Sequence, residues 1–136
     1  MTMAVTLTWA EGTPPSVEEY CALRRLTDLG DRNAEAARIG LANTLHAVTA
    51  RDGDKLIGMG RIIGDGGTFV QVTDIGVDPA YQGRGIGTEV VRRLNLWCDQ
   101  TLPPTCYISL IADPGAEKLY ERAGFSYVTG MCRHVG

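Results

Sequence analysis

The 136-residue sequence lacks the residue spacings that metal centres and disulfide frameworks need. Its four cysteines are scattered and never form a C-x-x-C pair, and its two histidines, His46 and His134, lie far apart in the chain. We therefore expect no metal site, and thiols that stay reduced and pack as small apolar side chains. The cysteines are Cys21, Cys98, Cys106 and Cys132.

The sequence also lacks a basic patch and any long apolar run. The formal net charge is −3, and no cluster of Lys or Arg supports nucleic-acid binding. The apolar runs are far shorter than a membrane span, and no signal-peptide pattern opens the chain. We therefore expect a cytoplasmic protein with no membrane or nucleic-acid partner. Its length suits one domain and is too short for two ordinary ones.

The most informative stretch is a strand, a glycine-rich turn and a helix. Apolar and polar residues alternate from Val70 to Val77 as in a strand, and Asp78-Pro79 breaks that pattern. An amphipathic helix follows, with Ile86, Val90, Leu94 and Trp97 on one face. A helix that begins after exposed glycines offers backbone N–H groups and a partial positive charge to phosphate, and Arg84 adds a full charge. The alternative is a glycine-rich helix entry with no ligand.

The spacing of the glycines separates several phosphate-binding motifs. Gly83, Gly85 and Gly87 do not fit the G-x-G-x-x-G dinucleotide fingerprint, and no Gly-Lys pair of a Walker A loop occurs. The turn instead resembles the Gln/Arg-x-x-Gly-x-Gly/Ala loop of the GCN5-related N-acetyltransferases (GNAT superfamily). The resemblance implies that loop amides bind the pyrophosphate of acetyl-coenzyme A (acetyl-CoA). The loop residues predicted to contact it are Gln82, Gly83, Arg84, Gly85, Ile86, Gly87 and Thr88.

The remaining elements give the order of the fold. We predict a strand over 5–9, a helix opened by the capping box at Ser16 to Glu19, and a second helix over 33–41. Strands over 44–50, 55–63 and 68–77 form an antiparallel meander, because an Asp-Gly pair marks the first turn. A strand over 105–111, a helix started by Asp113 as N-cap with Pro114, and a strand over 125–129 complete the order.

This order predicts one α/β (α+β) domain over 1–136 with a mixed, mostly antiparallel sheet and helices on both faces. The crossover helix requires the strand over 105–111 to run parallel to the strand before the loop. The resemblance implies a GNAT fold in which these two strands splay and the thioester arm pairs with Ile75, Gly76 and Val77. It also divides the chain into an acceptor-side half, 1–67, and an acetyl-CoA-binding half, 68–136. A bulge glycine without a ligand role is the alternative for Gly76.

A second motif lies near the C-terminus. The residues from Asp113 to Phe125 resemble the family pattern Asn-x-x-Ala-x-x-Leu-Tyr-x-x-x-Gly-Phe, with Ala116 and Tyr120 in place. The resemblance implies cofactor contacts at Asp113 and Ala116. The family has Asn where this chain has Asp113, and a carboxylate cannot donate the amide hydrogen bond that Asn offers to the pantetheine arm.

Acyl transfer to an amine needs a base, an oxyanion donor and an acid. An alkyl ammonium with a pKa of about 10.4 must lose a proton, and Asp74 is the candidate base, with a structural Asp at a strand kink or a water chain as alternatives. Its spacing puts Asp74 on the strand face of Val72 and Gly76. By resemblance, the amide of Val77 or a neighbour holds the oxyanion. Tyr120 is the candidate acid for the departing thiolate, with a packed aromatic as the alternative.

These features predict an acetyl-CoA-dependent N-acetyltransferase that acts on a primary amine, a small molecule in our leading hypothesis. The acetyl group transfers directly, through a tetrahedral intermediate, because no cysteine resembles a nucleophile. A protein N-terminal or lysine acetyltransferase is one alternative, and a non-catalytic acyl-CoA sensor or scaffold is another. A homodimer through the C-terminal strand is a hypothesis for the oligomeric state.

Overall fold

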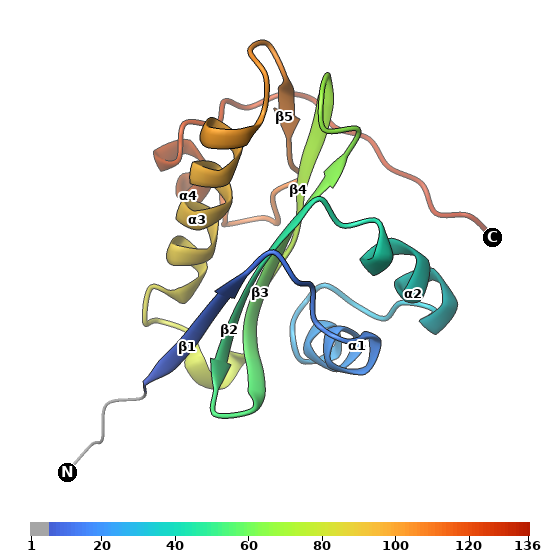
Figure 1. Ribbon diagram of the computed structural model, residues 1–136, viewed down its shortest axis with the longest axis vertical. Coiled ribbons are helices and arrows are strands. Elements are labelled where there is room, and N and C mark those ends of the chain that lie inside the picture. The colour runs from blue at the N-terminus through green and yellow to red at the C-terminus, as the bar shows by residue number, and fades with distance from the viewer. Residues whose placement is uncertain (1–5) are drawn as a thin grey trace.

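The computed structural model describes residues 6–136 and contains a mixed five-stranded sheet with helices on both faces. The strands are β1 (Leu7–Glu11), β2 (His46–Asp52), β3 (Lys55–Gly64), β4 (Phe69–Val77) and β5 (Tyr107–Ser109). The helices are α1 (Val17–Leu26), α2 (Ala34–Ala42), α3 (Ile86–Thr101) and α4 (Glu117–Arg122), with a 3-10 turn η1 at Pro79–Tyr81. Figure 1 shows α1 and α2 on one face of the sheet and α3 and α4 on the other.

The strands lie in sequence order, β1-β2-β3-β4-β5. The first four are antiparallel neighbours, and β5 runs parallel to β4 after the α3 crossover. Asp52 pairs with Lys55 across the predicted Asp-Gly turn, where Gly53 has φ +59°. The fold class and the predicted meander are therefore confirmed. The first strand was predicted over 5–9, and its residue Val5 lies outside the described residues.

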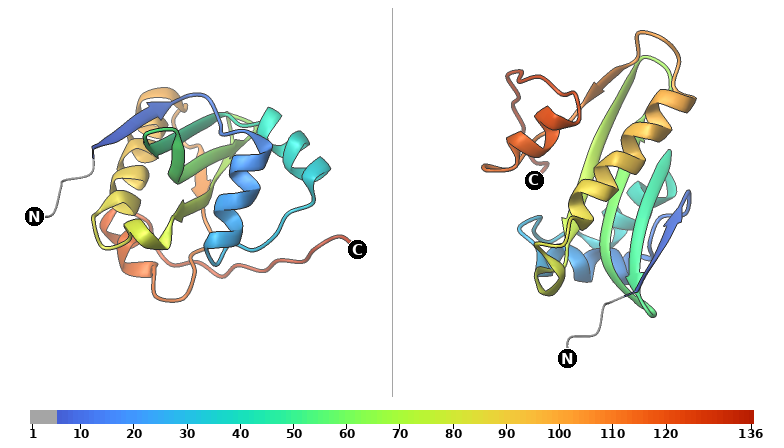
Figure 2. Two further views of the ribbon diagram at one scale, coloured as in Figure 1. Left: turned by 90° about the horizontal axis from the view of Figure 1, so that it is seen from below. Right: turned by 90° about the vertical axis from the view of Figure 1, so that its left-hand side faces the viewer.

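Two apolar clusters hold the layers together. Between the sheet and α3, the predicted helix face is buried at Ile86, Val90 and Leu94. On the other face, Tyr20 and Leu23 of α1 pack with Met59 of β3. Figure 2 shows α3 lying along the length of the sheet, so both ends of this helix are fixed by the core. The capping box of Ser16 and Glu19 is present at the start of α1, as predicted.

The predicted strand over 125–129 is absent from the structure. After Arg122 the chain passes Gly124, in the left-handed conformation at φ +97°, and residues 125–136 form no helix or strand. The aromatic and β-branched residues of 125–129 favour a strand, but a strand also needs the edge of a neighbour to pair with. Here Tyr127 and Met131 lie 83% and 93% exposed, and Figure 1 shows the segment running past the sheet toward the α2 side.

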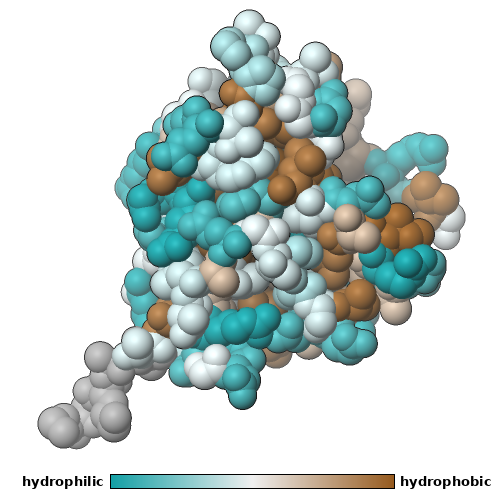
Figure 3. All heavy atoms as spheres, in the orientation of Figure 1, coloured by the Kyte–Doolittle hydropathy of each residue, from teal (hydrophilic) through white to brown (hydrophobic). Residues whose placement is uncertain are grey.

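Apolar side chains also reach the surface near α2. Leu26 and Ile39 are about half exposed, and Figure 3 shows apolar patches on the side where α2 and the C-terminal segment lie. The opposite lower part of that view is mostly polar. Within residues 6–136, no helix is both long and apolar enough to cross a membrane.

Candidate active site

The glycine-rich turn has the open geometry that the sequence predicts. Asp78 caps η1 by accepting a hydrogen bond from the N–H of Ala80 at 2.9 Å, and Gly83 and Gly85 follow with φ of +80° and +77°. Gly85 is the N-cap of α3 and has no side chain to satisfy the first N–H groups of the helix. The first helical bond runs from the N–H of Glu89 to the carbonyl of Gly85 at 3.0 Å. The N–H groups of residues 86–88 therefore face outward at the positive end of the helix.

Two cations lie near the ring of Tyr81 beside this turn, and one of them, Lys55, is paired with Asp78 at 3.3 Å. The guanidinium of Arg84 lies 5.3 Å from the centre of the Tyr81 ring, and the ammonium of Lys55 lies 6.0 Å from it. The phenol of Tyr81 donates a hydrogen bond to Asp52, which fixes the ring against the β2–β3 hairpin. Gln82 donates to the carbonyl of Val77 at 3.3 Å, so the turn is tied to the end of β4. The arrangement can hold an anionic group at the start of α3.

The end of β4 has a free edge next to this turn. β5 pairs only with Phe69–Gln71, whereas β4 continues to Val77. The N–H of Asp78 donates to the carbonyl of Ile57 on β3 at 2.7 Å. Because successive amides of a strand point to opposite sides, the N–H groups of Val77 and Ile75 point away from β3, toward the free edge. The predicted contact residues Ile75 and Val77 therefore present backbone donors there.

Gly76 makes its close contact on the other side of the strand. A Cβ at this position would lie 3.0 Å from Cδ1 of Leu29 and 3.5 Å from Cγ2 of Thr27. The loop between α1 and α2 therefore packs directly on β4 where the strand ends. Glycine allows this close approach, because a larger residue would require the side chain of Leu29 to shift.

Asp74 lies in a buried cluster of donors. Its carboxylate accepts hydrogen bonds from the phenol of Tyr20 at 2.8 Å, from Nε of Arg61 at 2.9 Å and from Nη1 of Arg24. Burial, followed by the charge of Asp74 and the hydrogen bond to it, raises the pKa of Tyr20. The carboxylate thus has the hydrogen-bonded environment of the structural alternative, and its role as a base stays a prediction.

The prediction that Asp74 shares a strand face with Val72 is wrong. Val72 packs in the cluster beneath α3, whereas Asp74 contacts α1 on the opposite face. The cause is a bulge: Arg61 pairs with Thr73 and Met59 pairs with Gly76, so one extra residue is inserted in β4. The φ of Asp74 is +57°, which a strand of regular alternation does not contain.

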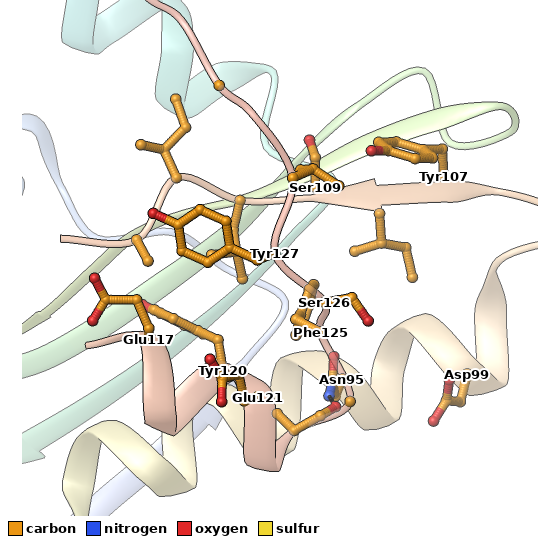
Figure 4. Close-up of a pocket in the computed structure, with 18 residues that line it drawn as sticks. Asn95, Asp99, Tyr107, Ser109, Glu117, Tyr120, Glu121, Phe125, Ser126 and Tyr127 are labelled. Carbon is orange, nitrogen blue, oxygen red and sulfur yellow. Dashed lines mark hydrogen bonds between the residues drawn. The ribbon is translucent and has the colours of Figure 1, made fainter. Parts of the chain in front are cut away.

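Tyr120 projects from α4 toward a cavity of about 570 Å³ between β5, α3, α4 and the C-terminal segment. Its ring meets Phe125 edge to face, with centroids 6.3 Å apart. Figure 4 shows Tyr120 and Tyr127 on one side of the cavity, with Tyr107 and Ser109 on β5. Burial, and then the charge of Asp113, raises the pKa of Tyr120. The phenol therefore stays protonated at neutral pH, as a proton donor must.

The start of α4 differs from the prediction. Its N-cap is Ala116 and its first residue is Glu117, so the expectation of Asp113 as N-cap and Pro114 as first helical residue is wrong. The carbonyl of Asp113 accepts a hydrogen bond from the N–H of Ala116 at 2.9 Å, which closes a turn. Gly115 in that turn has φ +94°, a left-handed conformation that a right-handed helix cannot include.

In the described residues, neither a reactive buried thiol at Cys98 nor a metal-binding cluster is found. Burial is the main cause that raises the pKa of Cys98 to about 11, so its thiol is protonated at neutral pH and is a poor nucleophile. Among residues 6–136, no group of three or more His, Cys, Asp or Glu is placed to hold a metal ion.

Four further residues belong to the site, although the sequence analysis did not select them as site residues. Arg24, Arg61 and Tyr20 surround Asp74, and Asn95 of α3 donates to the carbonyl of Ala123 at 2.8 Å, holding the end of α4. Arg24, Arg61 and Tyr20 lie outside both motifs in sequence, and Asn95 lies in the helix that follows the glycine turn. Nothing in their local pattern distinguishes them from ordinary helix and strand residues.

Comparisons with known proteins agree with this geometry. A model of the acetyltransferase (GNAT) domain matches residues 43–127, more than half of the chain. The chain belongs to the GNAT family of acetyltransferases. In this family the donor substrate is acetyl-CoA, and the glycine turn and free strand edge lie in the matched region.

The GNAT chain is similar to several characterised or solved relatives. It is 40% identical over 87 residues to the N-alpha-acetyltransferase RimI of Mycobacterium tuberculosis, covering 61% of this chain and 53% of that protein. The chain thus spans about half the length of this curated relative. A Staphylococcus aureus structure, described as a protein of unknown function and probable acetyltransferase, is 39% identical with a TM-score of 0.89. That alignment covers 96% of this chain and 100% of the other.

A third relative shows how far the fold extends without sequence similarity. The structure of the ribosomal-protein-S18-alanine N-acetyltransferase of Escherichia coli has a TM-score of 0.73 at 15% identity, covering 91% of this chain and 80% of that chain. At this identity the likeness concerns the fold alone.

Proposed function

We propose that this GNAT protein transfers the acetyl group of acetyl-CoA to a primary amine of a small molecule. The observation that carries the acetyl-CoA part of the proposal is the joint geometry of the glycine turn and the end of β4. The turn offers free N–H groups at the start of α3 with Arg84 beside them, and β4 offers the N–H of Val77 at a free edge. A diphosphate and an extended amide arm, joined in one molecule, match these two surfaces.

The chain's own residues supply the steps of the reaction. The acetyl thioester provides an activated carbonyl, and the N–H of Val77 is placed to stabilise negative charge on its oxygen. Tyr120 holds a proton for the departing thiolate, since its raised pKa keeps the phenol protonated. The amine loses its proton before or during attack, and direct transfer needs no thiol nucleophile in the protein.

One observation favours a second acceptor class. The relative from Mycobacterium tuberculosis is an N-alpha-acetyltransferase, and it is 40% identical to this chain over 87 residues. A protein N-terminus is itself a primary amine. The second candidate is therefore acetylation of a protein or peptide α-amino group.

The test is thiol release from acetyl-CoA against small amines and against peptides with free α-amino groups. We expect at least one small amine to be turned over, with Tyr120→Phe lowering kcat at least tenfold and leaving acetyl-CoA affinity unchanged. Tyr127→Phe removes the other phenol on that side of the cavity, which is 83% exposed, and so tests whether the effect belongs to Tyr120 alone. Turnover of peptides alone would favour the second candidate. Undiminished kcat in Tyr120→Phe would remove Tyr120 from the mechanism, and no binding of acetyl-CoA would overturn the proposal.

A further inference from the structure

The bulge at Asp74 decides which way the end of β4 faces. Before it, Val72 packs beneath α3. After it, the Cδ1 of Ile75 again lies on the α3 side, 2.7 Å from the position of a Cβ at Gly60, where Val90 also approaches. A regular strand of the same residues, alternating from Val72 without a bulge, would place Gly76 beneath α3 and Ile75 against α1. The bulge therefore exchanges the faces of the last strand residues.

The same inserted residue decides which amides reach the free edge. The amide of Asp78 bonds to β3, so those of Val77 and Ile75 point toward the edge that β5 leaves open. A shift of one residue would turn the amide of Gly76 to that edge instead. The proposed oxyanion donor is thus selected by the bulge and not by the identity of Val77.

Asp74 is suited to hold this bulge through both its backbone and its side chain. Asp is among the few residues other than glycine that adopt the left-handed conformation readily. Its side chain is 5% exposed, and those of Arg24 and Arg61 are 3% and 7% exposed. Three donors from α1 and β3 contact the carboxylate, and its burial among them leaves an amine substrate little access to it.

The two arginines extend the cluster to the acceptor side of the fold. Arg24 also donates to the carbonyls of Gly30, at 3.0 Å, and of Leu29, in the loop that packs on Gly76. Arg61 also donates to the carbonyl of Gly40, at 3.1 Å, and to the hydroxyl of Thr44, at 2.7 Å, at the end of α2. One carboxylate thereby joins the end of β4 to both acceptor-side helices.

We propose that Asp74 is a positioning residue of acetyl transfer: held by Arg24 and Arg61, it fixes the left-handed bulge that turns the N–H of Val77 to the free edge of β4. This inference rests on the proposed function for the role of that N–H. It replaces the base hypothesis for Asp74, and the proton of the amine leaves through water. The cluster also fixes the loop at Leu29 against the same strand, so donor and acceptor sides are set together.

The test compares Asp74→Asn, Asp74→Gly and Asp74→Ala. Asn keeps the left-handed tendency and one acceptor oxygen, Gly keeps only the backbone freedom, and Ala keeps neither. We expect kcat/KM for acetyl-CoA to fall about tenfold in Asp74→Asn and about a hundredfold in Asp74→Ala, with Asp74→Gly above Asp74→Ala. The acidic limb of the pH–rate profile should keep its position in every active variant. Equal inactivation of all three, or loss of the acidic limb in Asp74→Asn, would show a base and overturn the proposal.

A binding measurement separates this inference from the proposed function and does not depend on turnover. In ¹⁵N–¹H spectra, acetyl-CoA should shift the amide signals of Gly85 to Thr88 and of Val77 in the wild type. Asp74→Ala should keep the loop shifts and lose that of Val77. Loop shifts without a Val77 shift in the wild type would overturn the positioning role and leave the proposed function standing. No shift anywhere in the loop would overturn both.

Two further variants control for folding. Arg61→Lys keeps the positive charge but loses the planar set of donors, and it should weaken the Val77 response while the protein still melts cooperatively. An unchanged response in folded Arg61→Lys would contradict the proposal. Asp65→Asn is the matched control, because Asp65 is an exposed carboxylate that caps the turn at the opposite end of β4. It should alter stability without altering the Val77 signal.

Discussion

Gly60 of β3 lies directly beneath Val90 of α3, and a Cβ at Gly60 would come within 2.6 Å of Cγ1 of Val90. That Cβ would also lie 2.7 Å from Cδ1 of Ile75 and 2.8 Å from Cδ1 of Leu94. All three neighbours belong to the packed cluster between the sheet and α3, so none can withdraw without displacing others. The absence of a side chain at Gly60 therefore sets how closely α3 approaches the sheet opposite the bulge.

Gly60→Ala should destabilise the fold by about 1–3 kcal/mol, the usual cost of overpacking a core. Gly40→Ala is the matched control, since Gly40 lies inside α2 with only a 3.9 Å contact to Arg61. Replacing a helix glycine by alanine should stabilise by about 0.5–1 kcal/mol. Urea unfolding of both variants measures the difference, and an equal effect of the two substitutions would contradict the packing described here.

Glu19→Gln should reduce stability at neutral pH and lose that effect in acid. The hydrogen bond from Arg51 is the main cause that lowers the pKa of Glu19 to about 2. Because this folded value lies below the reference value of 4.5, the stabilisation is complete above about pH 4.5 and disappears as the pH falls toward 2. The free energy of unfolding, measured from pH 7 to pH 2, should therefore converge for wild type and variant. Glu18→Gln, an exposed change on the same helical turn, is the matched control for the loss of one carboxylate.

Asp113→Asn should lower the pKa of Tyr120 toward its ordinary value of 10.0. Burial is the larger cause of the raised pKa and remains, while the charge of Asp113, the second cause, is removed. The change in absorbance at 295 nm with pH, taken as the difference from a Tyr120→Phe background, follows this phenol alone. A titration that is identical with and without the Asp113 charge would show that the two groups do not interact.

Arg84→Ala should weaken acetyl-CoA binding by about tenfold at low salt while leaving thermal stability nearly unchanged. Arg84 is exposed beside the start of α3, where its charge and the helix dipole act on the same anion. The loss should shrink as salt rises, because screening weakens exposed charge interactions. Arg92→Ala removes an exposed guanidinium from the outer face of the same helix, paired with Glu89 at 2.6 Å, and should leave the affinity as it is. Equal losses in both variants would indicate a general charge effect.

The parts of the fold that the sequence predicts well are those encoded locally. The Asp-Gly turn, the capping box at Ser16 and the left-handed Gly83 and Gly85 each depend on residues within a few positions of one another. The long helix follows from the period of Ile86, Val90 and Leu94. Local chemistry is enough for such elements, and the resemblance to the family motif added the ligand class expected at the glycine turn.

From the sequence, a kink at Asp74 was only an alternative to a regular strand, because the cause of the bulge is distant in the sequence. Val72, Thr73, Asp74 and Ile75 alternate as a regular strand does, and aspartate gives only a weak signal for the left-handed conformation. Arg24 and Arg61 lie 50 and 13 positions away from Asp74. Only the packing of α1 on β3 brings them together.

The C-terminal segment shows the converse error. The aromatic and β-branched residues from Phe125 to Thr129 favour a strand, yet pairing requires an available edge in the right direction, which composition does not encode. The start of α4 was misplaced because Asp-Pro is a common beginning of a helix. The left-handed Gly115 two residues later overrides that signal.

The short contact between β4 and β5 has a consequence for the pace of catalysis. In the described part of the chain, β5 accompanies β4 only as far as Gln71, which leaves a stretch of a few residues for a transient partner. For the proposed reaction, spent coenzyme A must leave that stretch after every cycle. A longer free edge would hold the product through more backbone bonds and lengthen its residence time. The point where β5 ends thus sets a balance between capturing the donor and releasing what remains of it.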